Sequence, residues 1–160
     1  MGTLGIKLPV KAAVACMLLP LASLAAPVCE PLQAELPPGG VSFVHRHKVP
    51  ELVDGVVSVA DELVLWNRQP ESLCFFVTAV QRNLHQCWLF GRAERQGSGT
   101  YIYEDKSCKV VLEVRSNRVK MNVTDPSDSK RKGCNPEETP AFSCGMNTWI
   151  PSATYVTERH

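Results

Sequence analysis

Apolar and polar residues alternate in short stretches along most of the chain after residue 40. Stretches of strand length that are rich in β-branched or aromatic residues are 41–49, 56–66, 73–80, 87–94, 100–105, 108–114 and 119–123. The segments between them contain the Gly, Pro, Asn and Ser residues that favour turns. This pattern predicts a mainly β protein with a single antiparallel β-sheet domain, either a sandwich or a barrel-like meander.

Two of these stretches depart from simple alternation. Residues 56–66 (VVSVADELVLW) begin with β-branched residues, which favours a strand, although 60–63 could form a helical turn. We predict a strand with a bulge or kink near Asp61. Residues 73–80 (LCFFVTAV) are almost continuously apolar, which is typical of a central strand covered on both faces.

The first 25 residues have the pattern of a signal peptide. Two lysines precede an apolar segment at 12–24, and Ser23 and Ala25 occupy the −3 and −1 positions of a cleavage site after Ala25. The apolar segment contains Pro20 and is shorter than the ~20 residues that span a bilayer. The sequence therefore predicts a periplasmic or secreted protein without a membrane span.

The rest of the chain divides at residue 40. Residues 26–40 form a Pro-rich lead-in, and 41–160 form the single β-rich domain. Charge is nearly balanced, with 17 Lys and Arg against 16 Asp and Glu. This composition gives no reason to expect nucleic acid as a partner.

The cysteines indicate an oxidising compartment. Cys16 leaves with the predicted signal peptide, and an even number remains, which predicts three disulfides from 15 possible connectivities. The remaining cysteines are Cys29, Cys74, Cys87, Cys108, Cys134 and Cys144. Zinc is not predicted, because the sequence contains no Cys-x-x-Cys motif.

A hairpin suggests the first cysteine pair. If a turn centred on Gly97-Ser98 joins two adjacent strands, Cys87 and Cys108 lie opposite each other. Directly opposed Cβ atoms are ~4.5–5.5 Å apart, which a small adjustment brings to disulfide distance. We therefore predict a Cys87–Cys108 disulfide.

The other pairs follow from spacing and elimination. Cys134 and Cys144 enclose a short segment in a polar region, where a local disulfide would restrain a long loop. Cys29 and Cys74 then remain, and their disulfide would fasten the Pro-rich lead-in to a core strand.

No arrangement of residues predicts catalysis. The chain lacks a Gly-x-Ser-x-Gly motif, and the glycines around Ser98 favour a turn. The cysteines are all expected to be oxidised. Glu104 and Asp105 are adjacent on a strand, so their carboxylates point to opposite faces. The sequence therefore does not predict an enzyme.

Metal binding is also not predicted. His45 and His47 lie on one face of a strand and could supply two ligands. No third ligand is assured among Glu51, Asp54 and His85. We interpret both histidines as surface or half-buried side chains, and we predict neither a metal nor a cofactor.

Two longer motifs resemble a group of small exported bacterial proteins. Residues 83–93 (NLHQCWLFGRA) are similar to its N-G-H-x-C-x-x-x-G-x-A signature, with Leu84 in place of the glycine. Residues 101–110 (YIYEDKSCKV) are similar to the Y-x-Y-x-D-x-x-C-x-L run that follows, and Cys134 and Cys144-Gly145 complete the pattern. Some members of this group are linked by name to lysozyme inhibition.

This resemblance, together with the lack of catalytic groups, suggests an exported binding protein. It would inhibit a lysozyme-type cell-wall (peptidoglycan) hydrolase or act as an immunity protein against one. We expect the hairpin tip to contact the partner through Gln96, Gly97, Ser98, Gly99 and Tyr101; the loop between Cys134 and Cys144 is the alternative contact. A structural or interaction protein of the envelope, with no enzyme target, is the competing interpretation.

Overall fold

The computed structural model describes residues 29–30, 35–51, 55–81, 84–106, 108–126, 134, 142–143 and 150–157. The predicted signal peptide with its cleavage site after Ala25 lies outside these residues, as does Cys144. Across the described ranges, we find no helical segment with the length and apolar character needed to cross a membrane.

The described strands pair antiparallel throughout. Their bounds are β1 Val41–Glu51, β2 Gly55–Trp66, β3 Ser72–Val80, β4 Gln86–Gly97, β5 Thr100–Asp105, β6 Cys108–Val114, β7 Arg118–Thr124, β8 Phe142–Ser143 and β9 Ala153–Val156. Neighbouring strands run in the order β3-β2-β1-β9-β7-β6-β5-β4, and β4 also pairs with β3, so eight strands close into a barrel. The short β8 adds to β4 beside Trp88 and Leu89. The predicted fold class is confirmed, with the barrel as its form.

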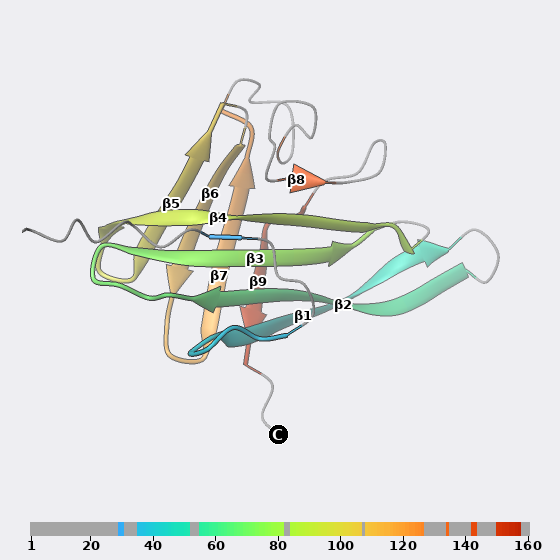
Figure 1. The fold of residues 1–160 in the computed structure, drawn as a ribbon. Helices are drawn as coiled ribbons and strands as arrows, with labels where there is room; N and C mark the ends of the chain where they lie inside the picture. The colour runs from blue at the N-terminus through green and yellow to red at the C-terminus, as the bar shows by residue number, and fades with distance from the viewer. Residues whose placement is uncertain are drawn as a thin grey trace, which may run out of the picture.

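The barrel has two layers of strands that cross steeply. In Figure 1, β1 to β4 run across the molecule, and β5, β6, β7 and β9 cross them at a large angle. Strand β4 forms the corner between the layers. It pairs with β3 from Gln86 to Glu94, but with β5 only at Glu94, Arg95 and Gly97. Crossed layers of this kind have strands that change sheet at the corners.

Alternation decides which side chains fill the barrel. Strand β6 shows the alternation most clearly. Every second residue from Cys108 to Val114 is buried, and the residues between them are half-buried. Each large apolar side chain removed from water stabilises the fold by about 1.5–3 kcal/mol. The largest fully buried side chains include Phe43, Leu63, Leu65, Leu73, Phe75, Leu89, Leu112, Met121 and Tyr155.

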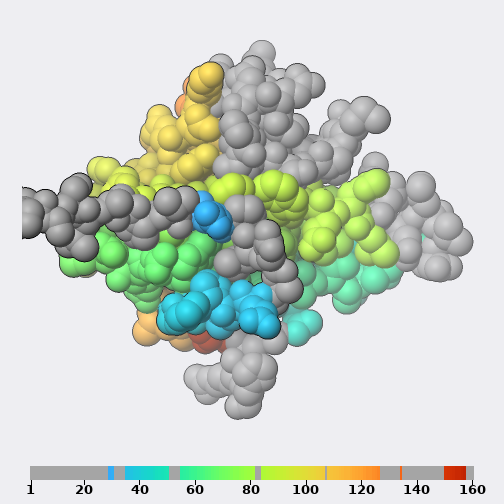
Figure 2. Space-filling view, viewed as in Figure 1, coloured from blue at the N-terminus to red at the C-terminus, as the bar shows by residue number. Residues whose placement is uncertain are grey.

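A second buried cluster lies on the outside of the barrel wall. It consists of Val64, Trp66 and Cys74, with Cys29 and Phe76 packed against it. The predicted Cys29–Cys74 disulfide is confirmed and joins the lead-in to β3. Figure 2 shows residues 29–30, in blue, against this face. The lead-in explains why the first half of β3 is buried on both faces, as its apolar run predicts.

The other two predicted disulfides are wrong. Cys108 pairs with Cys134, with the Cα atoms 4.4 Å apart. This bond excludes both Cys87–Cys108 and Cys134–Cys144. Cys87 is itself disulfide-bonded, and its partner lies outside the described residues.

The hairpin argument for Cys87 and Cys108 fails because β5 leaves β4 early. Their ladder reaches only from the turn to the Glu94–Ile102 pair, and β5 then continues in the other layer. At the far end of β5, Cys108 lies opposite Asp105, whereas Cys87 lies opposite Ala79 of β3.

The predicted strand over 56–66 is confirmed, but the bulge that was the first of two forms predicted near Asp61, a bulge or a kink, is absent from its ladder with β1. Strands β1 and β2 pair without interruption from Val41–Leu65 to Glu51–Gly55. Asp61 lies opposite His45, and its side chain is completely buried. Two hydrogen bonds to Oδ1 of Asp61, described below, offset part of the cost of burying this carboxylate.

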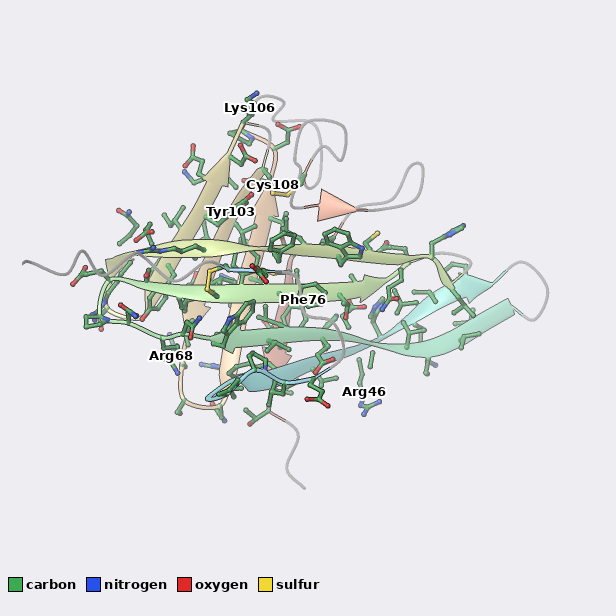
Figure 3. All side chains as sticks on the ribbon, in the orientation of Figure 1. Arg46, Arg68, Phe76, Tyr103, Lys106 and Cys108 are labelled. Atoms are coloured by element: carbon green, nitrogen blue, oxygen red, sulfur yellow. A yellow bond between two sulfur atoms is a disulfide. The ribbon has the colours of Figure 1, made fainter. Side chains whose placement is uncertain are left out.

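One close contact joins the two layers across the interior. A Cβ placed on Gly91 of β4 would lie 2.6 Å from Cε2 of Tyr103 and 3.2 Å from Cε1 of Phe75. The rings of Phe75 and Tyr103 meet edge to face with centroids 5.5 Å apart, and Figure 3 labels Tyr103 on the crossing layer. Gly91 therefore makes room for an aromatic side chain from the crossing layer.

Candidate functional site

The turn between β4 and β5 presents the predicted contact residues at one end of the barrel. Gly97 pairs with Thr100, and Ser98 and Gly99 form the turn between them. The register shifts between Arg95 and Gly97, so Gln96 is an extra residue in a bulge. Gln96, Gly97 and Ser98 are exposed, whereas Gly99 is half-buried. These four residues form a small projecting tip, referred to below as the tip.

Arg95 braces this tip against the neighbouring connection. Its Nε donates to the carbonyl of Gly97 at 3.1 Å, and its Nη1 donates to the carbonyl of Pro70 at 3.0 Å. The Arg95 backbone N–H donates to the carbonyl of Glu71 at 2.8 Å. These three hydrogen bonds tie the β2–β3 and β4–β5 connections together. Sequence reasoning missed Arg95 because its partners include carbonyls 25 residues away.

Gly99 holds the other side of the tip. Its carbonyl accepts a hydrogen bond from the backbone N–H of Val114 at 2.7 Å. Its φ is +76°, and a Cβ there would lie 2.8 Å from the carbonyl oxygen of Val114. Only glycine fits such a backbone without strain. The tip is therefore fixed by the Arg95 side chain on one side and by a backbone hydrogen bond on the other.

Tyr101 does not belong to the exposed contact set. Its side chain is 7 % exposed and lies in the barrel core, opposite Leu112 of β6. Alternation explains this position, because Tyr101 and Tyr103 share the inward face of β5. Burial raises the pKa of Tyr103 to about 12, with a further contribution from the charge of Asp105. The predicted contact surface is thus reduced to residues 96–99.

The second predicted contact was the loop enclosed by Cys134 and Cys144. Because Cys134 pairs with Cys108, no local disulfide encloses that loop. Most of it lies outside the described residues. The tip is the candidate that the structure describes.

A polar cluster occupies the barrel interior between β1 and β2. His47 Nε2 donates to Oδ1 of Asp61 at 2.9 Å, and the backbone N–H of Val80 donates to the same oxygen at 2.8 Å. Asp61 is completely buried, while the His47 side chain is 23 % exposed. Asp61 therefore fixes the orientation of His47. Both histidines were identified from their spacing along a strand, but Asp61 was not recognised as the partner of His47.

Tyr155 and His45 complete this cluster. His45 stacks on His47 with ring centroids 5.4 Å apart and lies 5.8 Å from the Tyr155 ring. Burial raises the pKa of Tyr155, and the charge of Asp61 raises it further. Within the described residues, no group of three metal-ligating side chains is arranged to hold an ion. The cluster thus consists of one hydrogen bond from His47 of β1 to Asp61 of β2 and of ring contacts among His45, His47 and Tyr155.

No family model, curated protein or solved structure matches this chain. Fold and side-chain geometry therefore define the class: a disulfide-braced antiparallel barrel with a fixed, exposed tip.

Proposed function

We propose that this chain is an exported binding protein that contacts a partner protein through residues 96–99. The partner would be a cell-wall hydrolase of the lysozyme type, which the chain inhibits or against which it gives immunity. Export is supported by the signal-peptide pattern before residue 26 and by disulfides, which persist in oxidising compartments. The target class is supported by the sequence resemblance alone.

The bracing of the tip is the observation that carries this proposal. Arg95 and the Gly99–Val114 hydrogen bond fix a small projection whose outermost residues are exposed. A loop that is already ordered loses little conformational freedom on binding, so its contacts contribute fully to affinity. This is the form expected of a projection that enters a cleft.

Positive charge beside the tip supports a partner whose cleft contains carboxylates. Arg95 is exposed even though it donates to two carbonyls. Glycoside hydrolases use a pair of carboxylates at the scissile bond. An exposed guanidinium beside a projecting turn complements such a cleft.

Inhibition assays test this function. Oxidised protein is titrated against a panel of muramidases and amidases, and the rate of peptidoglycan hydrolysis is measured. We expect at least one enzyme to be slowed. Ser98→Trp should weaken that inhibition at least roughly tenfold, because a large ring at the centre of the tip prevents close approach.

Lys106→Trp is the matched control. Lys106 is exposed in the β5–β6 turn, and Figure 3 shows it far from Arg68, which lies in the β2–β3 connection beside the tip. Inhibition should be unchanged in this variant. The proposal fails if no enzyme is bound or slowed, or if both tryptophan variants weaken inhibition equally.

The alternative is an envelope protein without an enzyme target. Trp88 and Phe90 favour it, because both are half-buried on the outer face of β4 with ring centroids 5.9 Å apart. Aromatic side chains of this kind are common in protein interfaces. Affinity capture from an envelope extract would favour this alternative if the retained protein is not a hydrolase and Ser98→Trp does not reduce its capture.

A further inference from the structure

A hollow lies on the outer face of the second layer, away from the barrel interior. Its volume is about 290 Å³, and its lining residues are Glu113, Arg115, Arg118, Lys120 and Thr154. We call it the basic hollow. It lies beside the tip, because the Val114 N–H donates to Gly99. None of its residues was identified from the sequence, since they come from three strands and a turn.

Strand register brings these side chains together. Lys120 of β7 is paired with Glu113 of β6 on one side and with Thr154 of β9 on the other. Paired residues point to the same face of a sheet, so all three face outward. Arg118 lies two residues before Lys120 and shares this face.

The turn between β6 and β7 holds the two arginines at the rim. The backbone N–H of Arg115 donates to the carbonyl of Arg118 at 2.9 Å, which closes the turn. The backbone N–H of Thr157 donates to the carbonyl of Asn117 at 3.1 Å. These hydrogen bonds fix the backbone from which both guanidinium groups project.

Positive charge in the hollow exceeds negative charge. Three cationic side chains face one carboxylate. The Lys120 Nζ lies 3.6 Å from Glu113 Oε1, and both side chains are about half exposed, so this pair neutralises little. Neither Arg115 nor Arg118 forms a side-chain ion pair with any residue that the structure describes. Within the described residues, both guanidinium groups are thus available to an anion.

We propose that the basic hollow binds an acidic monosaccharide unit, meaning a sugar that carries a carboxylate or phosphate group. The guanidinium groups of Arg115 and Arg118 would donate to the oxyanion, because their planar forks match carboxylate and phosphate oxygens. Glu113 would accept a hydrogen bond from a sugar hydroxyl. A site for a simple anion would not need this carboxylate. The volume lies at the small end of ligand pockets and fits one sugar ring.

This proposal is independent of hydrolase inhibition and has its own readout. Isotope-labelled oxidised protein is titrated with glucuronate, a phosphorylated glucose, glucose and inorganic phosphate, and amide shifts are followed by two-dimensional NMR. We expect both acidic sugars to shift the amides around Arg115 and Arg118 saturably. The affinity should fall with added salt, because screening weakens exposed charge pairs.

Variants assign the contacts. Arg115→Gln and Arg118→Gln should each weaken glucuronate binding roughly tenfold, because each removes a charge-assisted, bidentate contact. Arg118→Lys keeps the charge but loses the fork, so it should bind glucuronate more weakly than the unaltered protein. Glu113→Ala should weaken glucuronate binding while leaving inorganic phosphate as tight or tighter. Lys106→Gln, an exposed lysine at the other end of β5, is the control and should not change binding.

Three results would overturn the proposal. Glucose binding as tightly as glucuronate would remove the role of the oxyanion. Inorganic phosphate binding as tightly as both acidic sugars would remove the role of the sugar. Equal weakening by Lys106→Gln and Arg118→Gln would show unspecific attraction to positive charge. Because the substituted side chains are on the outer face, circular dichroism should show unchanged folding for every variant.

Discussion

At the scale of single residues, Gly91 shows how tightly the two layers meet. The hydrogen on its Cα is the largest group that the ring of Tyr103 tolerates, since a Cβ would lie 2.6 Å from the ring. Phe75 lies on another side of the same site and limits how far the ring can move. A single added methyl group must therefore displace an aromatic side chain.

Gly91→Ala should accordingly lower the free energy of unfolding by roughly 1–3 kcal/mol, the usual cost of overpacking. Urea denaturation measures this change. Gly97→Ala is the control, because nothing lies within 4 Å of its Cβ position, and its stability should be nearly unchanged. If the clash is the cause, adding Tyr103→Ala to Gly91→Ala should cost less than the two separate changes predict. Equal loss in both glycine variants would contradict this account.

The buried tyrosines make stability depend on alkaline pH. An unfolded tyrosine loses its proton near pH 10, whereas burial raises the pKa of Tyr103 to about 12. The raised pKa means that the folded state favours the neutral form of the tyrosine. The resulting contribution to the free energy of unfolding is complete below pH 10 and is lost as the pH rises through about 12. The pKa of Tyr155 is raised in the same direction.

The urea midpoint should therefore fall steeply from about pH 10 to 12, and the fall should be smaller in Tyr103→Phe. Adding Tyr155→Phe should reduce it further. The Tyr155 hydroxyl is buried without a hydrogen-bond partner within the described structure, so its removal should cost little at pH 7. An identical alkaline fall in all three proteins would refute this assignment.

At the scale of strands and connections, the early separation of β5 from β4 decides the disulfide pattern. Cys108 begins β6 in the second layer, where it meets Cys134. This disulfide closes a segment of 26 residues. In the chain-entropy account, such a cross-link stabilises the fold by roughly 3–4 kcal/mol.

Peptide mapping without reduction should recover Cys29 linked to Cys74 and Cys108 linked to Cys134. The double variant Cys108→Ser/Cys134→Ser should lower the free energy of unfolding by roughly 3–4 kcal/mol, measured by urea denaturation. Replacing both cysteines avoids a free thiol that could exchange. A Cys87–Cys108 peptide in the map would contradict this connectivity.

Alternation predicted most strands well, because residues such as Val119 and Met121 alternate with polar neighbours such as Lys120. It could not predict where a ladder stops, since that depends on the crossing of two layers rather than on local sequence. Alternation did not predict the burial of Asp61, because a carboxylate is normally costly to bury. The groups that donate hydrogen bonds to it come from β1 and from the end of β3. It also missed β9, whose four residues gave too short a pattern.

The tip was also predicted only in part from the local sequence. Glycines at 97 and 99 predicted the turn and its exposure. Arg95 could not be identified as a brace, because its acceptor on Pro70 is distant in sequence. Tyr101 was predicted to lie on the contact surface, although it is two residues from Tyr103 and therefore shares the inward face of β5.

At the scale of the whole molecule, closure depends on the last strand. Strand β9 lies between β1 and β7, pairing with β1 at Val44–Val156 and with β7 from Arg118–Val156 to Met121–Ala153. Its Tyr155 is among the largest fully buried side chains. Without β9, two strand edges and a large part of the core would be open to water, which favours aggregation.

Truncation tests this dependence. A chain ending at residue 152 should fail to unfold cooperatively and should aggregate, because it loses the closing strand and the Tyr155 ring. A chain ending at residue 157 keeps β9 and should retain the far-ultraviolet circular dichroism and melting temperature of the full chain. Cooperative melting of the shorter chain would show that the barrel does not need closure.

Closure by β9 also sets the timing of folding. Strands β1 (Val41–Glu51) and β9 (Ala153–Val156) are far apart in the sequence, so a chain under synthesis cannot complete its core until β9 has emerged. Contacts this far apart in sequence form slowly, because a long loop must close first. The barrel therefore closes as a late step, after the strands between β1 and β9 have become available for pairing.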